Sequence, residues 1–123
     1  MNITDFDVTQ REALLDLLVL TMYVDGNLAS VEETRVKELL LVMGLNTDFD
    51  RNRQFDASVT RVRQHSLSPD AARACASRLA RNFPTREHRQ EVYAILNDLT
   101  ALDGSVSVEE QKYLATLREA FQM

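Results

Sequence analysis

Two short acidic segments constrain what this 123-residue chain can fold into, because one is a near copy of the other. Residues 25–33 read Asp-Gly-Asn-Leu-Ala-Ser-Val-Glu-Glu, and residues 103–110 read Asp-Gly-Ser-Val-Ser-Val-Glu-Glu. An apolar run at helical spacing precedes each Asp-Gly, whose glycine suits the left-handed turn that ends a helix. The Ser that stands three residues before a Glu forms a capping box with it, and a capping box begins a helix. We therefore predict a helix, a tight acidic turn and a second helix in each copy, and we call segments 25–33 and 103–110 the elbows.

The spacing of the two copies defines an internal repeat. The aspartates Asp25 and Asp103 differ in position by 103 − 25 = 78. The predicted capping boxes pair Ser30 with Glu33 and Ser107 with Glu110, and the positions of these glutamates differ by 110 − 33 = 77. On this reading the first elbow holds one extra residue. Duplicated helical hairpins commonly pack about a twofold axis, so we expect the elbows at related positions.

The rest of the chain fits an all-α, single-domain helical bundle over residues 1–123. With three Gly, two Pro and 45% hydrophobic residues, the chain has few helix breakers and enough apolar material for one core. We divide it into repeat one (about 8–44), an Arg-rich middle (45–84) and repeat two (about 85–122). Residues 8–24 are apolar nearly all round, which is typical of a central helix. Asp16 interrupts that run, and we expect it to point toward solvent or an Arg.

The middle section carries two further helix predictions. Residues 46–65 read as a helix with a break near 55–57. Ser68-Pro69-Asp70 is a start signal for a helix over 71–82, since Ser caps well and Pro suits the first helical position. That helix is rich in small residues, so a neighbour can approach closely, and Cys75 within it reads as a core filler. Thr85 is predicted to cap the next helix.

The net charge of −5 is unevenly distributed along the chain. Residues 1–50 carry 3 − 10 = −7, residues 51–90 carry 9 − 3 = +6, and residues 91–123 carry 2 − 6 = −4. One interpretation is that the arginines pair with acids on neighbouring helices. The alternative is that the Arg-rich middle binds nucleic acid or an anionic membrane surface, although few aromatic residues stand among its arginines to stack on bases.

The elbows offer two chemical interpretations. An EF-hand is excluded, because its first ligand positions would fall on Thr21 and Tyr23 in one copy and on Leu99 and Ala101 in the other. A site shared between the copies is a separate hypothesis, in which up to six carboxylates bind Ca²⁺, Mg²⁺ or Mn²⁺. Its candidate ligands are Asp25, Glu32, Glu33, Asp103, Glu109 and Glu110. The other interpretation needs no ion, because Glu in a first helical turn is favoured by the helix dipole alone.

Catalysis and membrane insertion are not expected. His65 and His88 are the only histidines, neither stands at a zinc or nucleophile spacing, and we expect His88 on the surface. The single cysteine excludes an internal disulfide, and residues 13–24 are too short and too polar to cross a bilayer. With no basic, apolar leader at the start, we expect a soluble cytosolic protein.

The elbow sequences also carry a resemblance to a known family. Residues 22–26, Met-Tyr-Val-Asp-Gly, followed by Ser-Val-Glu-Glu at 30–33 and echoed at 101–110, resemble the TerB-like family. That family comprises the tellurite-resistance TerB proteins and the related amino-terminal region of DjlA co-chaperones, and the resemblance covers the whole chain. It implies about seven helices, a divalent-ion role for the elbow acids, and a place in stress-associated protein complexes, often at the inner membrane face, rather than catalysis. Because the elbows differ in length, either Glu109 or Glu110 corresponds to Glu32.

Overall fold

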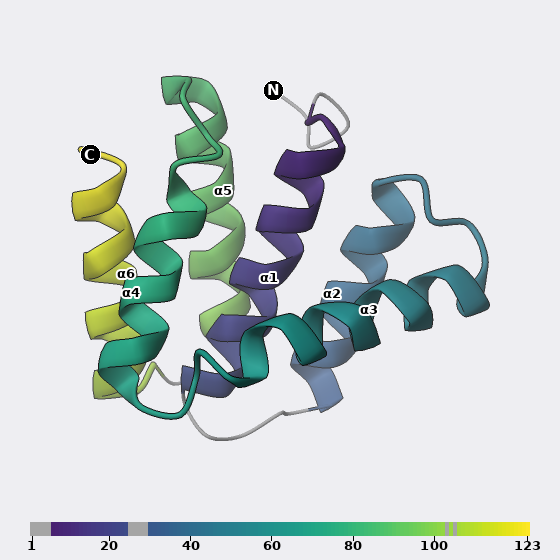
Figure 1. Ribbon diagram of the computed structural model, residues 1–123, viewed down its shortest axis with the longest axis horizontal. Coiled ribbons are helices and arrows are strands. Elements are labelled where there is room, and N and C mark those ends of the chain that lie inside the picture. The colour runs from purple at the N-terminus through teal and green to yellow at the C-terminus, as the bar shows by residue number, and fades with distance from the viewer. Residues whose placement is uncertain (1–5, 25–29, 103, 105) are drawn as a thin grey trace.

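The computed structural model describes residues 6–24, 30–102, 104 and 106–123, apart from the side chains of Ser30 and Val31. All regular secondary structure in these ranges is helical, as predicted, and it comprises six helices rather than about seven (Figure 1). They are α1 (Val8–Val24), α2 (Ser30–Val42), α3 (Asp48–Arg63), α4 (Pro69–Ala80), α5 (Arg86–Thr100) and α6 (Val108–Ala120).

The helices begin where the sequence places capping residues. Asp7 and Gln10 cap α1 reciprocally, because each side chain accepts a hydrogen bond from the backbone N–H of the other, at 2.8 and 3.1 Å. Ser68 caps α4 with Pro69 at its first position, and Thr85 caps α5, which confirms both predictions. Gly44, in the left-handed region at φ 103°, follows the end of α2.

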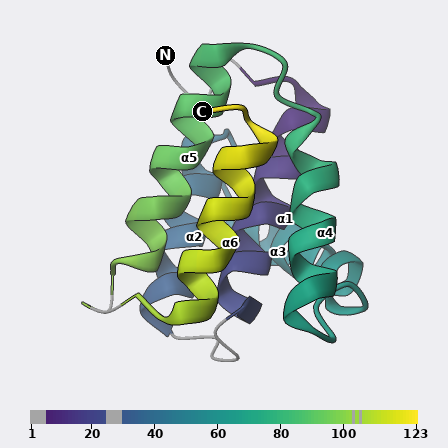
Figure 2. The ribbon, with the colours of Figure 1, turned by 90° about the vertical axis from the view of Figure 1, so that its left-hand side faces the viewer.

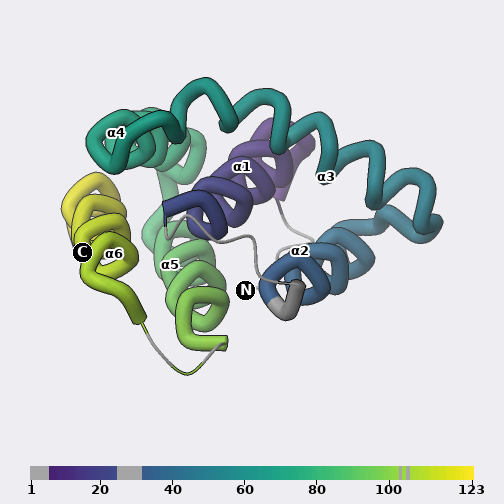
Figure 3. Tube along the Cα trace, turned by 90° about the horizontal axis from the view of Figure 1, so that it is seen from below, coloured from purple at the N-terminus to yellow at the C-terminus, as the bar shows by residue number. Residues whose placement is uncertain are grey.

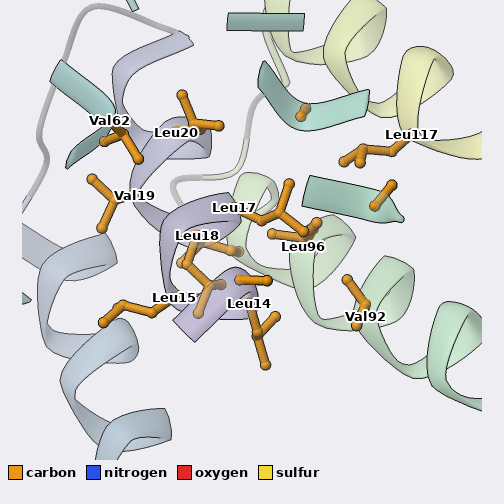
Figure 4. Close-up of a cluster of buried hydrophobic side chains, with 14 of the residues drawn as sticks. Leu14, Leu15, Leu17, Leu18, Val19, Leu20, Val62, Val92, Leu96 and Leu117 are labelled. Atoms are coloured by element: carbon orange, nitrogen blue, oxygen red, sulfur yellow. The ribbon is translucent and has the colours of Figure 1, made fainter. Parts of the chain in front are cut away.

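Helix α1 is the centre of the bundle and contacts each of the other five helices. Figure 4 shows its side chains leaving in several directions, with Val19 beside Val62 of α3 and Leu17 beside Leu96 of α5. The prediction of a central helix is confirmed. Around it, α4 and α6 run side by side, and α5 lies next to α6 (Figure 2). The predicted small-residue face of α4 is buried here, with Ala72, Cys75 and Ala76 at the contact.

Helix α3 crosses the bundle without the break predicted near residues 55–57 (Figure 3). Phe55, Ser58 and Val62 are its buried residues, and their spacing of three and four places them on one continuous helical face. The sequence of α3 holds no Gly or Pro to interrupt it. The looser apolar spacing that indicated a break reflects a mostly exposed helix that buries a narrow stripe.

The helix boundaries fix the register of the repeat. Helix α2 runs from 30 to 42 and α6 from 108 to 120, while α1 begins at 8 and α5 at 86, so that these three pairs of bounds each differ by 78; the ends of α1 and α5 differ by 100 − 24 = 76. The capping residues Asp7 and Thr85 obey the same offset. The prediction of an extra residue in the first elbow is therefore wrong. The serine spacing misled it, because α6 has its capping Ser one position before the residue that matches Ser30.

Candidate functional site at the elbow end

The elements that flank the two elbows meet at one end of the molecule. Helices α1 and α5 end there, and α2 and α6 begin there, at the bottom of Figure 1. The turn between α3 and α4 lies at the same end. Of the six candidate ligands, Asp25 and Asp103 fall outside the described residues, as does Gly26. Gly104 has φ 84°, so the left-handed turn predicted for the second elbow is confirmed.

Glu110 forms the predicted capping box at the start of α6. Its Oε1 accepts a hydrogen bond from the Ser107 backbone N–H at 3.0 Å, and the Ser107 hydroxyl accepts one from the Glu110 N–H at 3.1 Å. The Glu110 residue is only 2% exposed. This carboxylate therefore ties down its own helix start. The corresponding prediction for Ser30 and Glu33 lies outside what the structure describes, because the Ser30 side chain is not part of it.

Glu32 matches Glu110 in position and in burial. It is the third residue of α2, as Glu110 is the third of α6, and it too is 2% exposed. The difference 110 − 32 = 78 equals the repeat offset set by the helix bounds. Glu110, not Glu109, therefore corresponds to Glu32.

Glu33 and Glu109 are more exposed than Glu32 and Glu110, and each forms an ion pair with a basic side chain. Glu33 Oε1 lies 3.4 Å from Lys37 Nζ, one helical turn away. Glu109 Oε2 lies 3.4 Å from Arg73 Nη1 of α4, and its Oε1 lies 3.8 Å from Lys112 Nζ. A cation that used these carboxylates would have to displace the basic partners. Among the residues that the structure describes, no three His, Cys, Asp or Glu side chains gather closely enough to hold a metal ion.

Exposed apolar side chains at this end are a feature that the sequence predictions missed. Leu67 is 84% exposed in the α3–α4 turn, and Val108 is 64% exposed at the start of α6. Leu102 and Val106, in the second elbow region, are 39% and 36% exposed. A pocket of about 230 Å³ opens beside Leu67, with Tyr23 and Pro69 among its lining residues. Apolar spacing could not reveal this surface, because these residues lie in turns and at helix ends.

The Arg-rich middle is partly used in packing. Asp16 is buried and accepts hydrogen bonds from the Ser58 hydroxyl at 2.5 Å and from Arg61 Nη2 at 2.8 Å, so it faces an Arg and not solvent. Arg61 and Arg73 thus confirm that arginines pair with acids on neighbouring helices. Binding of nucleic acid or anionic lipid stays a prediction. It would use five arginines that are exposed and take part in no ion pair within the described ranges. These are Arg53, Arg63, Arg78, Arg81 and Arg86.

The remaining reactive residue types lie in or against the core. Cys75 is buried, as predicted, and burial raises the pKa of its thiol above the ordinary value. His88 was expected on the surface, but it is partly buried, with its ring 4.7 Å from that of Phe6 in an edge-to-face contact. The prediction failed because Phe6 comes from a distant part of the chain.

Comparison with known proteins supports the resemblance noted from the elbow sequences. None of the helices in the described ranges is long and apolar enough to cross a membrane. No curated protein and no solved structure matches the chain significantly. A family model described as tellurite resistance protein TerB matches residues 11–123. Because that match spans both repeats and the middle between them, the chain belongs to the TerB family.

Proposed function

We propose that this chain is a non-enzymatic TerB-type module whose elbow end binds a divalent cation and receives a protein partner. The cation would be Ca²⁺, Mg²⁺ or Mn²⁺, since all candidate ligands are hard carboxylate oxygens. The main support is that Glu32 and Glu110, each 2% exposed, begin two helices that start at the same end of the bundle. Carboxylates that two helices bring to one end of the molecule are the oxygen ligands that such a cation uses. The full ligand set is Asp25, Glu32, Glu33, Asp103, Glu109 and Glu110.

The ion pairs at this end do not oppose the proposal strongly. The side chains of Glu33 and Lys37 are 42% and 35% exposed, and those of Glu109 and Lys112 are 38% and 58% exposed. Surface pairs of this kind contribute about 0–1 kcal/mol. A divalent cation can therefore displace the two lysines at little cost, whereas the pair of Glu109 with Arg73, whose side chain is 24% exposed, would cost more to displace.

Thermal unfolding with each of the three ions tests the cation. At 100 times the dissociation constant, binding adds about 2.7 kcal/mol, which raises the melting temperature of a chain of this length by roughly 10 °C. The double variant Asp25→Asn, Asp103→Asn should lose the shift. Asp50→Asn with Asp56→Asn removes the same charge from exposed positions on α3 and should keep it. No shift with any ion, or an equal shift in both double variants, would refute cation binding here.

The protein partner is tested separately. The exposed apolar residues among the carboxylates support it, because such patches on a soluble surface mark interaction sites. Affinity capture with the wild type should retain a partner that Leu67→Asp and Val108→Asp both lose. Met123→Asp, a change of the same kind at an exposed position beyond α6, serves as the control. A partner retained by both elbow-end variants would place its docking surface elsewhere.

A further inference from the structure

An apolar groove lies where α1 begins and α2 ends, far from the elbow that joins them. Its apolar walls are Val8 and Leu15 of α1, Leu40 and Met43 of α2, and Leu45, and its polar lining residues are Arg11, Glu12 and Gln54. Its volume is about 220 Å³. We call it the α1–α2 groove. It has room for a large apolar side chain, and it belongs to none of the surfaces considered above.

The repeat explains why this groove is open. At the offset set by the helix bounds, Leu15 corresponds to Tyr93 and Met43 to Phe121. Phe121 is 2% exposed and meets the Phe83 ring edge to face at 6.4 Å. Repeat two thus places aromatic side chains at positions where repeat one has smaller aliphatic ones. The α1–α2 groove therefore lacks the aromatic side chains that repeat two carries at the corresponding positions.

The surface around the groove also differs between the repeats. Val8, 73% exposed, stands where repeat two has Arg86, and Leu41, 49% exposed, stands where repeat two has Glu119. Both positions of repeat two are exposed and charged. The same architectural positions are thus polar in one copy and apolar in the other. Val8 lines the groove, and exposed apolar side chains beside an open groove are typical of a surface that another protein covers.

The chain itself carries an exposed aromatic side chain. Phe49, in the first turn of α3, is 71% exposed, and the neighbouring Asp48 and Asp50 are exposed carboxylates. Arg11, at the groove rim, donates from Nε to the Phe6 carbonyl oxygen at 2.9 Å, which fixes its guanidinium beside the opening. Glu12, which also lines the groove, pairs with Arg61, and Asp48 pairs with Arg51. No ion pair within the described residues involves Arg11 or Asp50, so the unpaired charge beside the ring is acidic and the unpaired charge at the groove is basic.

We propose that two copies of this chain form a twofold dimer in which Phe49 of each copy enters the α1–α2 groove of the other. Asp50 of the entering copy lies beside Arg11 of the receiving copy. In this twofold arrangement each contact is made twice, the interface is isologous, and the assembly closes as a dimer, whereas a head-to-tail arrangement of the same ring and groove would continue into longer assemblies. The dimer leaves both elbow ends accessible and does not depend on cation binding.

Sedimentation equilibrium of the full chain tests the dimer. The wild type should show a concentration-dependent dimer, and Phe49→Ala should weaken it by about 100-fold or more, because two buried rings are lost. Leu67→Ala removes an even more exposed apolar side chain at the elbow end and should leave the dissociation constant unchanged. A wild type that stays monomeric at all accessible concentrations overturns the proposal, and so does an equal effect of the two alanine variants.

A charge reversal tests the orientation of the two copies. Arg11→Glu and Asp50→Arg should each weaken the dimer, and the double variant should recover most of the wild-type affinity, since the pair is restored with opposite polarity. Met43→Phe, which introduces the residue of repeat two, should fill the groove and weaken the dimer while the circular dichroism spectrum stays helical. A double variant no better than the single ones, or a Met43→Phe dimer as tight as the wild type, overturns this geometry.

Discussion

Replacing Arg61 by Ala should destabilise the protein more than replacing Asp16 by Ala, although each removes one partner of the same ion pair. Asp16 lies in the central helix, 6% exposed, and accepts hydrogen bonds from Ser58 and Arg61. The Arg61 side chain is 35% exposed. The two partners therefore differ in their access to water, and this difference decides the order of the two effects.

The magnitudes follow from what each substitution leaves behind. Arg61→Ala leaves a buried carboxylate with the Ser58 hydroxyl as its remaining hydrogen-bond donor at this contact, which should cost about 3–5 kcal/mol. Asp16→Ala leaves the fully buried Ser58 hydroxyl without its acceptor, at about 1–3 kcal/mol, while Arg61 can turn to solvent. The triple variant Asp16→Leu, Ser58→Ala, Arg61→Leu removes every polar member and should lie within about 1 kcal/mol of the wild type.

Urea unfolding followed by circular dichroism measures these free energies. Glu12→Ala serves as the matched control, because Glu12 also pairs with Arg61, at 3.8 Å, but its side chain is 54% exposed. That variant should lose less than about 1 kcal/mol. An Asp16→Ala variant less stable than Arg61→Ala would show that burial of the carboxylate does not govern this cluster. A triple variant as unstable as either single one would refute the account as a whole.

Two further predictions concern single residues. Burial raises the pKa of Tyr113 above its ordinary value of 10.0. In alkali the folded chain therefore keeps a proton that the unfolded chain releases. The free energy of unfolding should thus fall as the pH rises above about 10. Tyr113→Phe should flatten that part of the pH profile of stability measured by urea unfolding. At neutral pH it should lower stability by about 1 kcal/mol, because the hydrogen bond to the Leu17 carbonyl is lost. An unchanged slope would show that other groups cause the alkaline loss. Gly104→Ala should cost about 1–2 kcal/mol in the same assay, because φ is 84° and an added Cβ meets no atom of the described residues within 4 Å, so that the penalty comes from backbone conformation. Gly104→Asn should cost less, and equal losses in the two variants would argue against that cause.

The sequence predicts the helices of this fold well because their signals are local. Ser68, Thr85 and Ser107 each cap a helix whose first N–H groups are three residues away, so a short window of sequence contains the whole interaction. The apolar circumference of residues 8–24 likewise predicts a central helix without any knowledge of its neighbours. Both signals depend on spacing along the chain.

What the sequence could not predict depends on distant partners. Asp16 meets Ser58 and Arg61, which lie 42 and 45 residues away, and nothing in the run around Asp16 indicates which arginine pairs with it. The repeat register was misjudged for a related reason. Two adjacent glutamates end each elbow, and residue identity cannot tell which one of each pair is buried, whereas the helix bounds and the burial of Glu32 and Glu110 can.

The position of α1 has a consequence for how the protein is made. The helix on which every other helix packs is also the first of the six to leave the ribosome, because it precedes the others in the chain. At ordinary rates of synthesis, about 5 to 20 s pass before the last of its partners is complete. Until then the central helix lacks part of the surface that it packs against in the folded chain, so the nascent chain should be a substrate for chaperones that bind exposed hydrophobic segments. The order of translation therefore exposes the central helix before all of its packing partners exist.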